Sequence, residues 1–353
     1  METMHRMIRM TVACTSLLMV CVSAAAGVDT SRVTSTVLKA VVKVTAFSST
    51  GAPVALGTGF LVSRATSPDE QSDRRYYLVT NKHMLGDWTL FNGTIVNYFP
   101  SIEATFYGET SAQPAMRVPL SVVDNQGKLH RNVQLHHGAT VDVAAIALTP
   151  NSLPLSPRSQ ISFDPSYMLA FDKITTYLTG LGDQVFALGY PRGVTSLTTS
   201  YPIAKAGYLA TEPGQPFAID LTGKDRSGNA VKRRLEGKIL LVDGLLVPGN
   251  SGGPVVLPAD LKVRRDPSTN QLQFATEQLK NYVIGIVSGN LDGSGLTLVY
   301  SVDYICEVID ALENEGGHRQ EINERIGGRL RRPVRPHGSL CLTAFGGLTR
   351  IFQ

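Results

Sequence analysis

Short apolar runs, each bounded by turn-forming residues, recur along this chain and limit the folds open to it. β-Branched and aromatic residues dominate runs such as residues 55–62, 76–80, 184–189 and 282–288. Each run has the length of a strand, and 33 glycines and 19 prolines supply turns between them. With 43% apolar and 18% charged residues, the 353-residue chain has the material for a buried core. The pattern predicts an all-β fold.

One interruption divides the strand pattern into two units. Prolines scattered among serines at residues 149–175 indicate a linker. The strands expected before it are residues 37–47, 55–62, 76–80, 94–99, 104–107 and 115–123, and those expected after it are residues 184–189, 198–208, 217–221, 238–242, 253–257, 282–288 and 297–302. Each set suits one closed barrel, so we expect two packed antiparallel β-barrels of about six to seven strands each.

A helix is expected at the end of the second unit. Ile305, Val308, Ile309 and Leu312 recur at helical spacing and therefore share one face. We expect residues 303–314 to form a helix that packs on the second barrel.

The first residues have the features of a secretory signal. Positively charged residues precede an apolar stretch at residues 10–22, and small residues suitable for cleavage follow at 23–27. About 13 apolar residues are too few for a spanning helix, which needs about 20. We expect an exported protein, periplasmic or extracellular, without a stable membrane anchor. Removal of the signal leaves Cys306 and Cys341, which form one disulfide only in an oxidising compartment.

Charge and ligand spacing argue against nucleic acid and metal. A net charge of +4 is mild, and residues 35–300 contain no basic stripe with interleaved aromatics. His136 and His137 lack ligands at the spacing of a zinc site, so we expect an exposed turn there. We expect no metal and no cofactor.

The segment Gly-Asn-Ser-Gly-Gly-Pro at residues 249–254 is the strongest functional signal. Its hydroxyl, on Ser251, stands between glycines that allow a sharp turn and close approach of a ligand. A nucleophilic serine needs such an exposed turn, with N–H groups aimed at the developing oxyanion. The same residue types are common in ordinary loops, so this segment alone does not decide the function.

Two further segments supply a base and an acid. The strand at residues 76–80 runs into a polar turn that holds His83, and Asp142 stands at the head of the apolar run 141–148. A charge at the end of a buried strand is costly unless it is paired, and an imidazole would pair it. The same pairing fixes the tautomer that a general base needs. We therefore predict a triad of His83, Asp142 and Ser251.

Five segments together resemble the trypsin-like serine peptidases, and most closely the bacterial Deg/HtrA-like branch. The segments, in family order, are Gly-Thr-Gly-Phe-Leu-Val at 57–62, Thr-Asn-Lys-His at 80–83, Asp-Val-Ala at 142–144, Ala-Leu-Gly-Tyr-Pro-Arg-Gly at 187–193 and Pro-Gly-Asn-Ser-Gly-Gly-Pro at 248–254. The resemblance implies a double barrel with the site between the barrels. It also implies a metal-independent serine endopeptidase that acts through an acyl-enzyme on polypeptides, unfolded protein among them.

The resemblance also assigns residues around the triad. The N–H groups of Gly249 and Ser251 match the oxyanion hole. Ser288, Gly289 and Asn290 match the strand against which substrate docks, and Ser288 matches the serine that contacts the triad aspartate.

Two leucines match positions of the side-chain pocket in the family. Leu245 matches its floor and Leu298 a wall, which implies cleavage after small or medium apolar residues, with Asp243 as the nearest acid. Asn250 departs from the aspartate that digestive enzymes use for activation by zymogen cleavage, so no such switch is expected. The chain after residue 314 is too short for the PDZ domain that follows the protease in many Deg/HtrA proteins.

Three other functions remain open from the sequence. One is a binding protein of the same fold with a blocked cleft, and another is an esterase of that fold. An α/β-hydrolase elbow also fits a serine between Gly249 and Gly253, but that fold needs a later histidine. The later ones, His318 and His337, lie in a segment without strand pattern.

The expected organisation follows from these assignments. It is a signal peptide at 1–26, a barrel with histidine and aspartate at 27–150, a linker at 151–180, a barrel with serine plus a helix at 181–314, and a Gly/Arg/Pro-rich tail at 315–353.

Overall fold

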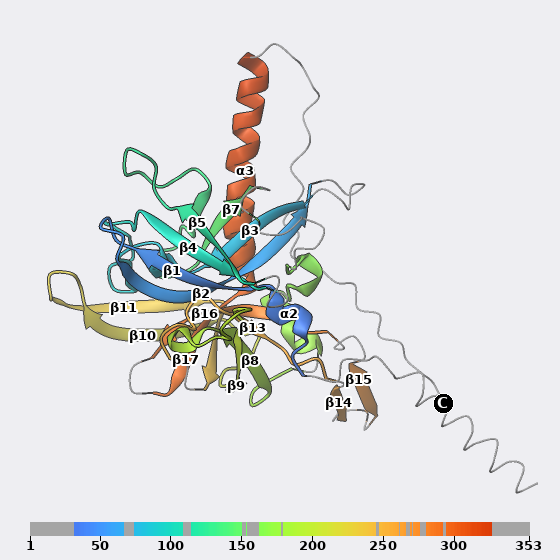
Figure 1. The fold of residues 1–353 in the computed structure, drawn as a ribbon. Coiled ribbons are helices and arrows are strands. Elements are labelled where there is room, and N and C mark those ends of the chain that lie inside the picture. The colour runs from blue at the N-terminus through green and yellow to red at the C-terminus, as the bar shows by residue number, and fades with distance from the viewer. Residues whose placement is uncertain are drawn as a thin grey trace, which may run out of the picture.

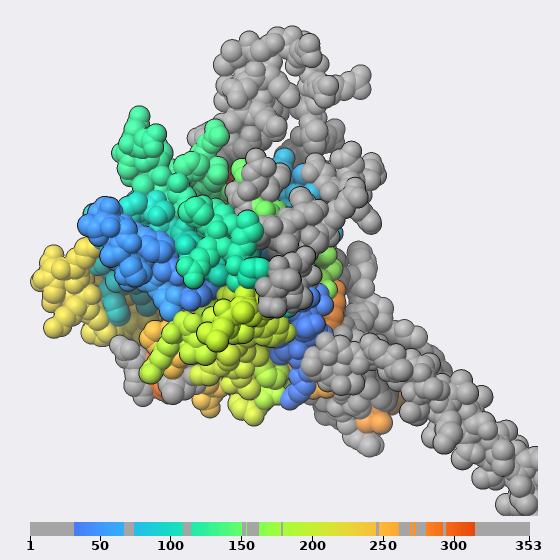
Figure 2. Space-filling view, in the orientation of Figure 1, coloured from blue at the N-terminus to red at the C-terminus, as the bar shows by residue number. Residues whose placement is uncertain are grey.

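Two β assemblies stacked on each other form the protein, with one long helix beside them (Figure 1). The structure is a computed structural model that describes residues 32–66, 74–108, 114–149, 153, 162–177, 179–244, 247–260, 262–265, 269, 271–275, 280–291 and 294–326. Figure 2 shows the N-terminal half, blue to teal, above the green-to-orange C-terminal half. One apolar cluster contains Phe60 and Val79 of the first half and Tyr190 and Ile286 of the second, so the halves share a core.

The N-terminal half is an antiparallel sheet of seven strands in the order β5-β4-β1-β2-β3-β7-β6. The strands are β1 (Val41–Phe47), β2 (Pro53–Ala65), β3 (Arg74–Thr80), β4 (Ser101–Phe106), β5 (Met116–Ser121), β6 (Val133–Leu135) and β7 (Ala144–Leu148). Side chains of a strand alternate between faces. Tyr77 and Val79 accordingly lie in the core shared by the two halves, and Leu78 lies in a second apolar cluster. Both faces are covered, which explains why β7 and residues 76–79 of β3 are continuously apolar.

The C-terminal half contains a closed six-stranded barrel in the order β12-β17-β16-β13-β8-β9. Its strands are β8 (Gln184–Gly189), β9 (Ile203–Leu209), β12 (Ile239–Asp243), β13 (Pro254–Val256), β16 (Val283–Asn290) and β17 (Leu296–Ser301). A third apolar cluster draws Val185, Leu240, Ile284 and Val299 from four of these strands. Closure leaves no free sheet edge and gives the chain between β12 and β13 a rigid frame.

A hairpin leaves this barrel and reaches back to the first sheet. Its strands β10 (Phe217–Lys224) and β11 (Ala230–Gly237) pair only with each other. In Figure 1 the hairpin is the yellow pair of strands at the left. Arg226 donates to Asp87, and Arg233 donates to the carbonyl oxygen of Phe91, both in the segment after β3. The remaining pair, β14 (Lys262–Arg265) with β15 (Leu272–Ala275), is separate from the barrel.

Helix α3 (Val302–Ile326) begins directly after β17 and contacts both halves. The predicted apolar face is confirmed, since Ile305, Val308, Ile309 and Leu312 are all buried. We expected this helix to pack on the second barrel. It also contacts β6 and β7 of the first sheet. Glu313 accepts hydrogen bonds from Tyr77 and Arg64 there.

The all-β class with a C-terminal helix is confirmed, and several local predictions need correction. The first assembly is a curled sheet rather than a closed barrel. Residues 35–39 form a short helix, α2 (Ser35–Lys39), ahead of β1. Residues 94–99 form no strand, because Asp87 accepts backbone N–H groups of Val96 and Asn97 and bends that segment. The expected strand at 217–221 belongs to the hairpin and not to the barrel.

Several predictions concern residues outside the described ranges, among them the signal peptide and Cys341. Cys306 is disulfide-bonded and buried. In the described part of the chain, no helix combines the length and apolar character needed to cross a membrane.

Candidate active site

Ser251 lies in a tight loop between β12 and β13, residues 247–254, which we name the serine loop. Gly249 has a φ of +103°, and a Cβ there would lie 2.3 Å from the carbonyl oxygen of Tyr190. Gly252 has a φ of +83° and is even more crowded, because its Cβ would lie 2.0 Å from a carbonyl oxygen of β2. Only glycine fits both positions. The loop therefore turns tightly and leaves Ser251 half-buried.

Thr58, in β2 of the first half, holds the serine loop from across the interface. Its N–H donates to the carbonyl oxygen of Ser251 at 2.7 Å, and its hydroxyl donates to that of Gly249 at 2.6 Å. The same hydroxyl accepts the N–H of Tyr190 at 3.1 Å. The carbonyl oxygen of Thr58 accepts the Thr80 hydroxyl at 2.8 Å. One buried threonine thus fixes the backbone on both sides of Asn250.

His83 and Asp142 form a closely bonded pair at the ends of β3 and β7. His83 lies in the short 3-10 helix η1 (Lys82–Met84), and Asp142 lies just before β7. Nδ1 of His83 is 2.6 Å from Oδ2 of Asp142, and the backbone N–H of His83 donates to Oδ1 at 3.2 Å. A carboxylate only accepts, so Nδ1 carries the proton and Nε2 keeps a free lone pair. Asn81 donates to the carbonyl oxygen of Asp142 at 2.6 Å and fixes that residue further.

Ser288 connects this pair to Ser251. Its hydroxyl donates to Oδ2 of Asp142 at 2.7 Å, and its carbonyl oxygen accepts the hydroxyl of Ser251 at 3.0 Å. The pairing of β16 with β17 shifts register between Val287 and Gly289, so Ser288 is the extra residue of a β-bulge. A bulge re-aims a side chain, which explains how Ser288 contacts both Asp142 and Ser251. No hydrogen bond between Ser251 and His83 occurs among the described residues.

The protonated, charged form of His83 is more stable in this site than it would be for a histidine in water. Burial lowers the pKa of His83, but the charge of Asp142 and its hydrogen bond outweigh burial and raise the pKa above its usual value. Asp142 is almost fully buried, and its carboxylate accepts three hydrogen bonds, from His83 twice and from Ser288. The pair therefore stabilises an imidazolium.

The two N–H groups expected in an oxyanion hole have no acceptor in the described part of the chain. The N–H groups of Gly249 and Ser251 make no hydrogen bond there, whereas those of Gly252 and Gly253 donate to Val287 and Asn250. The side chain of Asn250 is buried and donates to Val247 of the same loop.

The structure describes most of the expected substrate-binding residues. Ser288, Gly289 and Asn290 lie at the end of β16, where Gly289 pairs with Leu298 and Asn290 with Thr297. Leu298 is 5% exposed and belongs to the core that the two halves share. Its role as a pocket wall stays a prediction. Leu245 lies outside the described residues.

His136, His137 and Glu307 bring three potential metal ligands within 4.8 Å of one another. Their hydrogen bonds do not suit a metal. Nδ1 of His136 accepts the N–H of Gly138 at 2.9 Å, so the ring proton is on Nε2, which faces Glu307 at 2.8 Å. A metal on Nε2 would move the proton to Nδ1 and set it against the Gly138 N–H. His136 is buried, in contrast to the exposed turn expected for it, because α3 covers it.

Sequence reasoning did not identify Thr58, Asn81 or Lys82 as residues of the site. Thr58 and Asn81 lie in segments that carry the family resemblance, which was the available signal. Lys82 is 3% exposed and donates to the carbonyl oxygen of Gly138 at 2.8 Å. No sequence pattern shows that these side chains reach loops far away in the chain.

A family model described as a trypsin-like peptidase domain matches residues 57–263, more than half of the chain. The chain belongs to this family. The matched region begins in β2 and includes His83, Asp142 and Ser251.

Among solved structures, the chain is similar to the Rv3671c protease in its inactive form, at 18% identity over 78% of this chain and 90% of that chain, with a TM-score of 0.38. It is also similar to the active form of the Rv3671c protease from M. tuberculosis, at 19% identity over 77% of this chain and 80% of that chain, with a TM-score of 0.39. No curated protein matches the chain.

Proposed function

We propose that the protein is an exported serine endopeptidase that cleaves polypeptides through His83, Asp142 and Ser251. The observation that carries the proposal is the chain of hydrogen bonds from His83 through Asp142 and Ser288 to Ser251. This chain of bonds joins the histidine and the aspartate of the first half to the serine of the second half of a trypsin-like fold. Ser288 also matches the serine that contacts the triad aspartate in this family, and its hydroxyl donates to Asp142 here.

The proposed reaction begins at the hydroxyl of Ser251. Nε2 of His83 takes its proton as the oxygen attacks the peptide carbonyl, and later donates that proton to the leaving amine. The hydroxyl must first turn from the carbonyl oxygen of Ser288 towards His83. Asp142 holds the proton on Nδ1 and stabilises the imidazolium, and water then hydrolyses the acyl-enzyme on Ser251.

The N–H groups of Gly249 and Ser251 are proposed as the oxyanion hole, since neither has an acceptor in the described part of the chain. Substrate is proposed to add as a strand along Ser288, Gly289 and Asn290. With Leu298 as a pocket wall and Leu245 as its floor, the preferred cleavage follows small or medium apolar residues. Unfolded protein is the proposed substrate, and the Deg/HtrA-like branch is the proposed relationship.

The decisive experiment incubates the purified protein and its Ser251→Ala variant with unfolded casein, and labels both with a fluorophosphonate. We expect the wild-type protein alone to cleave casein and to be labelled at Ser251. A protein that is neither labelled at Ser251 nor able to cleave polypeptides would support a binding protein with a blocked cleft. Labelling without cleavage of any polypeptide, together with turnover of ester substrates, would support an esterase. A peptide library then tests specificity: dominant cleavage after lysine or arginine would refute the apolar pocket and implicate Asp243 or Asp292.

A further inference from the structure

Asp142 is carried by an irregular segment, residues 136–143, which we name the Asp142 loop. Its internal backbone bonds are few in the structure: the N–H of His136 donates to Val143 at 2.9 Å, and that of Val141 donates to Gly138 at 3.2 Å. Two such hydrogen bonds fix the backbone of a loop less firmly than the continuous hydrogen bonds between paired strands fix a sheet. The position of Asp142 therefore depends on side chains that hold the loop from outside.

These side chains come from both halves of the molecule. Lys82 donates to the carbonyl oxygen of Gly138 at 2.8 Å, from the turn that carries His83. The hydroxyl of Tyr300, in β17 of the second half, donates to the carbonyl oxygen of Thr140. Helix α3, which continues from β17, supplies Glu307. The Asp142 loop is thus held by Lys82 of its own half and by the continuous segment of β17 and α3 in the C-terminal half.

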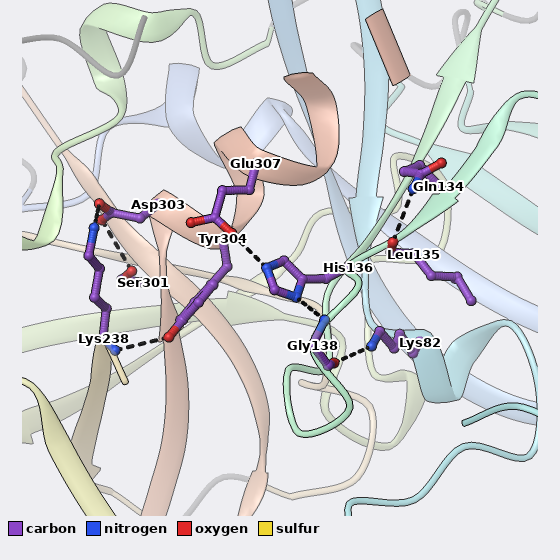
Figure 3. Close-up of polar contacts among 10 residues, drawn as sticks. All are labelled: Lys82, Gln134, Leu135, His136, Gly138, Lys238, Ser301, Asp303, Tyr304 and Glu307. Atoms are coloured by element: carbon purple, nitrogen blue, oxygen red, sulfur yellow. Dashed lines mark hydrogen bonds and ion pairs between the residues drawn. The ribbon is translucent and has the colours of Figure 1, made fainter. Parts of the chain in front are cut away.

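His136 connects the loop to that helix with both ring nitrogens (Figure 3). Nδ1 accepts the backbone N–H of Gly138 at 2.9 Å, and Nε2 lies 2.8 Å from Oε2 of Glu307. Because Nδ1 accepts, the single proton of the neutral ring is on Nε2 and is donated to Glu307. The ring is 6% exposed, stacks on His137 at 4.5 Å, and meets the edge of Tyr304 at 5.1 Å.

We infer that His136 is a positioning residue: as a neutral imidazole it fixes the Asp142 loop through Gly138 and couples that loop to helix α3 through Glu307. The inference deepens the proposed function, on which it rests for its effect on turnover. His136 does not touch substrate. It acts on catalysis through the place of Asp142, and hence through the orientation of His83.

The protonation state of His136 is part of this arrangement. A second proton, on Nδ1, would leave the Gly138 N–H without an acceptor and set two donors against each other. Burial lowers the pKa of His136, and the charges of His137 and Lys82 act in the same direction, while the hydrogen bond and charge of Glu307 oppose them. Tyr304 is the other titratable side chain against the ring. The neutral, doubly bonded ring therefore persists at neutral pH and is lost on acidification.

Two amide substitutions separate the two bonds of His136. In His136→Asn, the Oδ1 atom takes the place of Nδ1 and still accepts from Gly138, but nothing reaches Glu307. In His136→Gln, the side-chain amide N–H reaches Glu307, but no acceptor remains for Gly138. We expect each to lower kcat about tenfold with little change in KM, since small displacements of a catalytic group slow the chemical step.

Helix α3 supplies the matched controls. Glu307→Ala, at a partly exposed side chain, should lower kcat as His136→Asn does, whereas Glu307→Gln keeps an acceptor for Nε2 and should restore it. Asn314→Ala changes an exposed position of the same helix and should leave kcat at the wild-type value. If His136→Gln, His136→Asn and Glu307→Ala lower only the melting temperature and leave kcat unchanged, His136 is merely structural and the inference fails.

A measurement without substrate separates this inference from the proposed function. The proton between Nδ1 of His83 and Asp142 is expected to give a low-field ¹H NMR resonance. In the wild-type protein and in Glu307→Gln, this resonance should shift a second time on acidification, below the titration of His83 itself. In His136→Asn and His136→Gln, which cannot titrate at this position, the second shift should be absent. A protein that cleaves nothing but shows this difference refutes the proposed function and supports the inference; a second shift that persists in both variants refutes the inference.

Discussion

The opposite half of the molecule helps to hold both the serine loop and the Asp142 loop, but by different means. Thr58 of the first sheet holds the serine loop through two carbonyl oxygens, and glycines let the backbones touch. The Asp142 loop is held by long side chains, those of Lys82, Tyr300 and the His136–Glu307 pair. The N–H and hydroxyl groups of Thr58 do not titrate, whereas the side chains of Lys82, Tyr300 and His136 do. The nucleophile is therefore expected to keep its place across pH, and the aspartate to depend on pH.

The largest expected effects come from the catalytic side chains of the two loops. Ser251→Ala and His83→Ala should each reduce kcat by about 10⁶, and the double variant should be no slower, because the residues act as one unit. Asp142→Asn should reduce kcat by about 10⁴, since it favours the wrong tautomer of His83. Peptide hydrolysis measures all of them.

A variant with an exposed substitution serves as the control for these measurements. Ser121→Ala, at an exposed position of β5, should have wild-type kcat. Full turnover in His83→Ala would contradict the assignment.

The crowding of the serine loop predicts the next effect. Gly249→Ala places a methyl group 2.3 Å from the carbonyl oxygen of Tyr190 and adds strain at a φ of +103°. The peptide that carries the Gly249 N–H must move, so we expect kcat to fall by about 10²–10³, the usual loss of one oxyanion donor.

Gly182→Ala is the matched control, because Gly182 has a φ of +83° but no atom within 4 Å of an added Cβ. It should lower stability slightly and leave kcat unchanged. Equal effects of the two substitutions on kcat would show that strain at positive φ, and not the contact with Tyr190, is responsible.

The Asp142 loop should show its dependence on pH through Lys82. Burial lowers the pKa of Lys82 from 10.5 to about 8, although the charge of Asp142 opposes this. The folded protein then binds fewer protons than the unfolded chain between these pH values, so the free energy of unfolding rises with pH across that window. The gain amounts to about 3 kcal/mol at 1.36 kcal/mol per pKa unit.

Lys82→Met should remove this rise, as measured by urea denaturation at pH 7 to 10.5 of both proteins. The difference between them isolates Lys82 from the tyrosines that titrate in the same range. Parallel curves for the two proteins would contradict the assignment of a depressed pKa to Lys82.

The smallest effect is expected for the hydroxyl that holds the serine loop. Thr58→Val keeps the shape and the N–H bond to Ser251. It leaves the carbonyl oxygen of Gly249 without its donor and the N–H of Tyr190 without its acceptor. We expect a loss of about 1–2 kcal/mol in unfolding free energy, equal at all pH values. Thr58→Ser retains the hydroxyl and should recover most of it. A loss that varied with pH would remove the contrast between the two loops.

Local patterns in the sequence predicted much of the fold. The strand at residues 184–189 was expected with the bounds that β8 has, and the apolar face of α3 was expected residue by residue. Alternation and helical spacing depend on near neighbours, so they can be recognised in one sequence. The hairpin β10–β11 could not be distinguished from a barrel strand, because its pattern of one covered and one exposed face fits either position.

In the candidate site, too, some features could be predicted from the sequence and others needed the tertiary structure. The sequence determined its residue types and order, since a nucleophile on a glycine turn, a histidine after a strand and an acid at a strand head are each local signals. The contact of Ser288 with Asp142 was implied by the family resemblance. Only the tertiary structure decided that Thr58 holds the serine loop, that Glu307 bonds to His136, and that His136 is buried under α3. The reason is physical: these bonds join residues more than a hundred positions apart, and their geometry exists only after the two halves share a core.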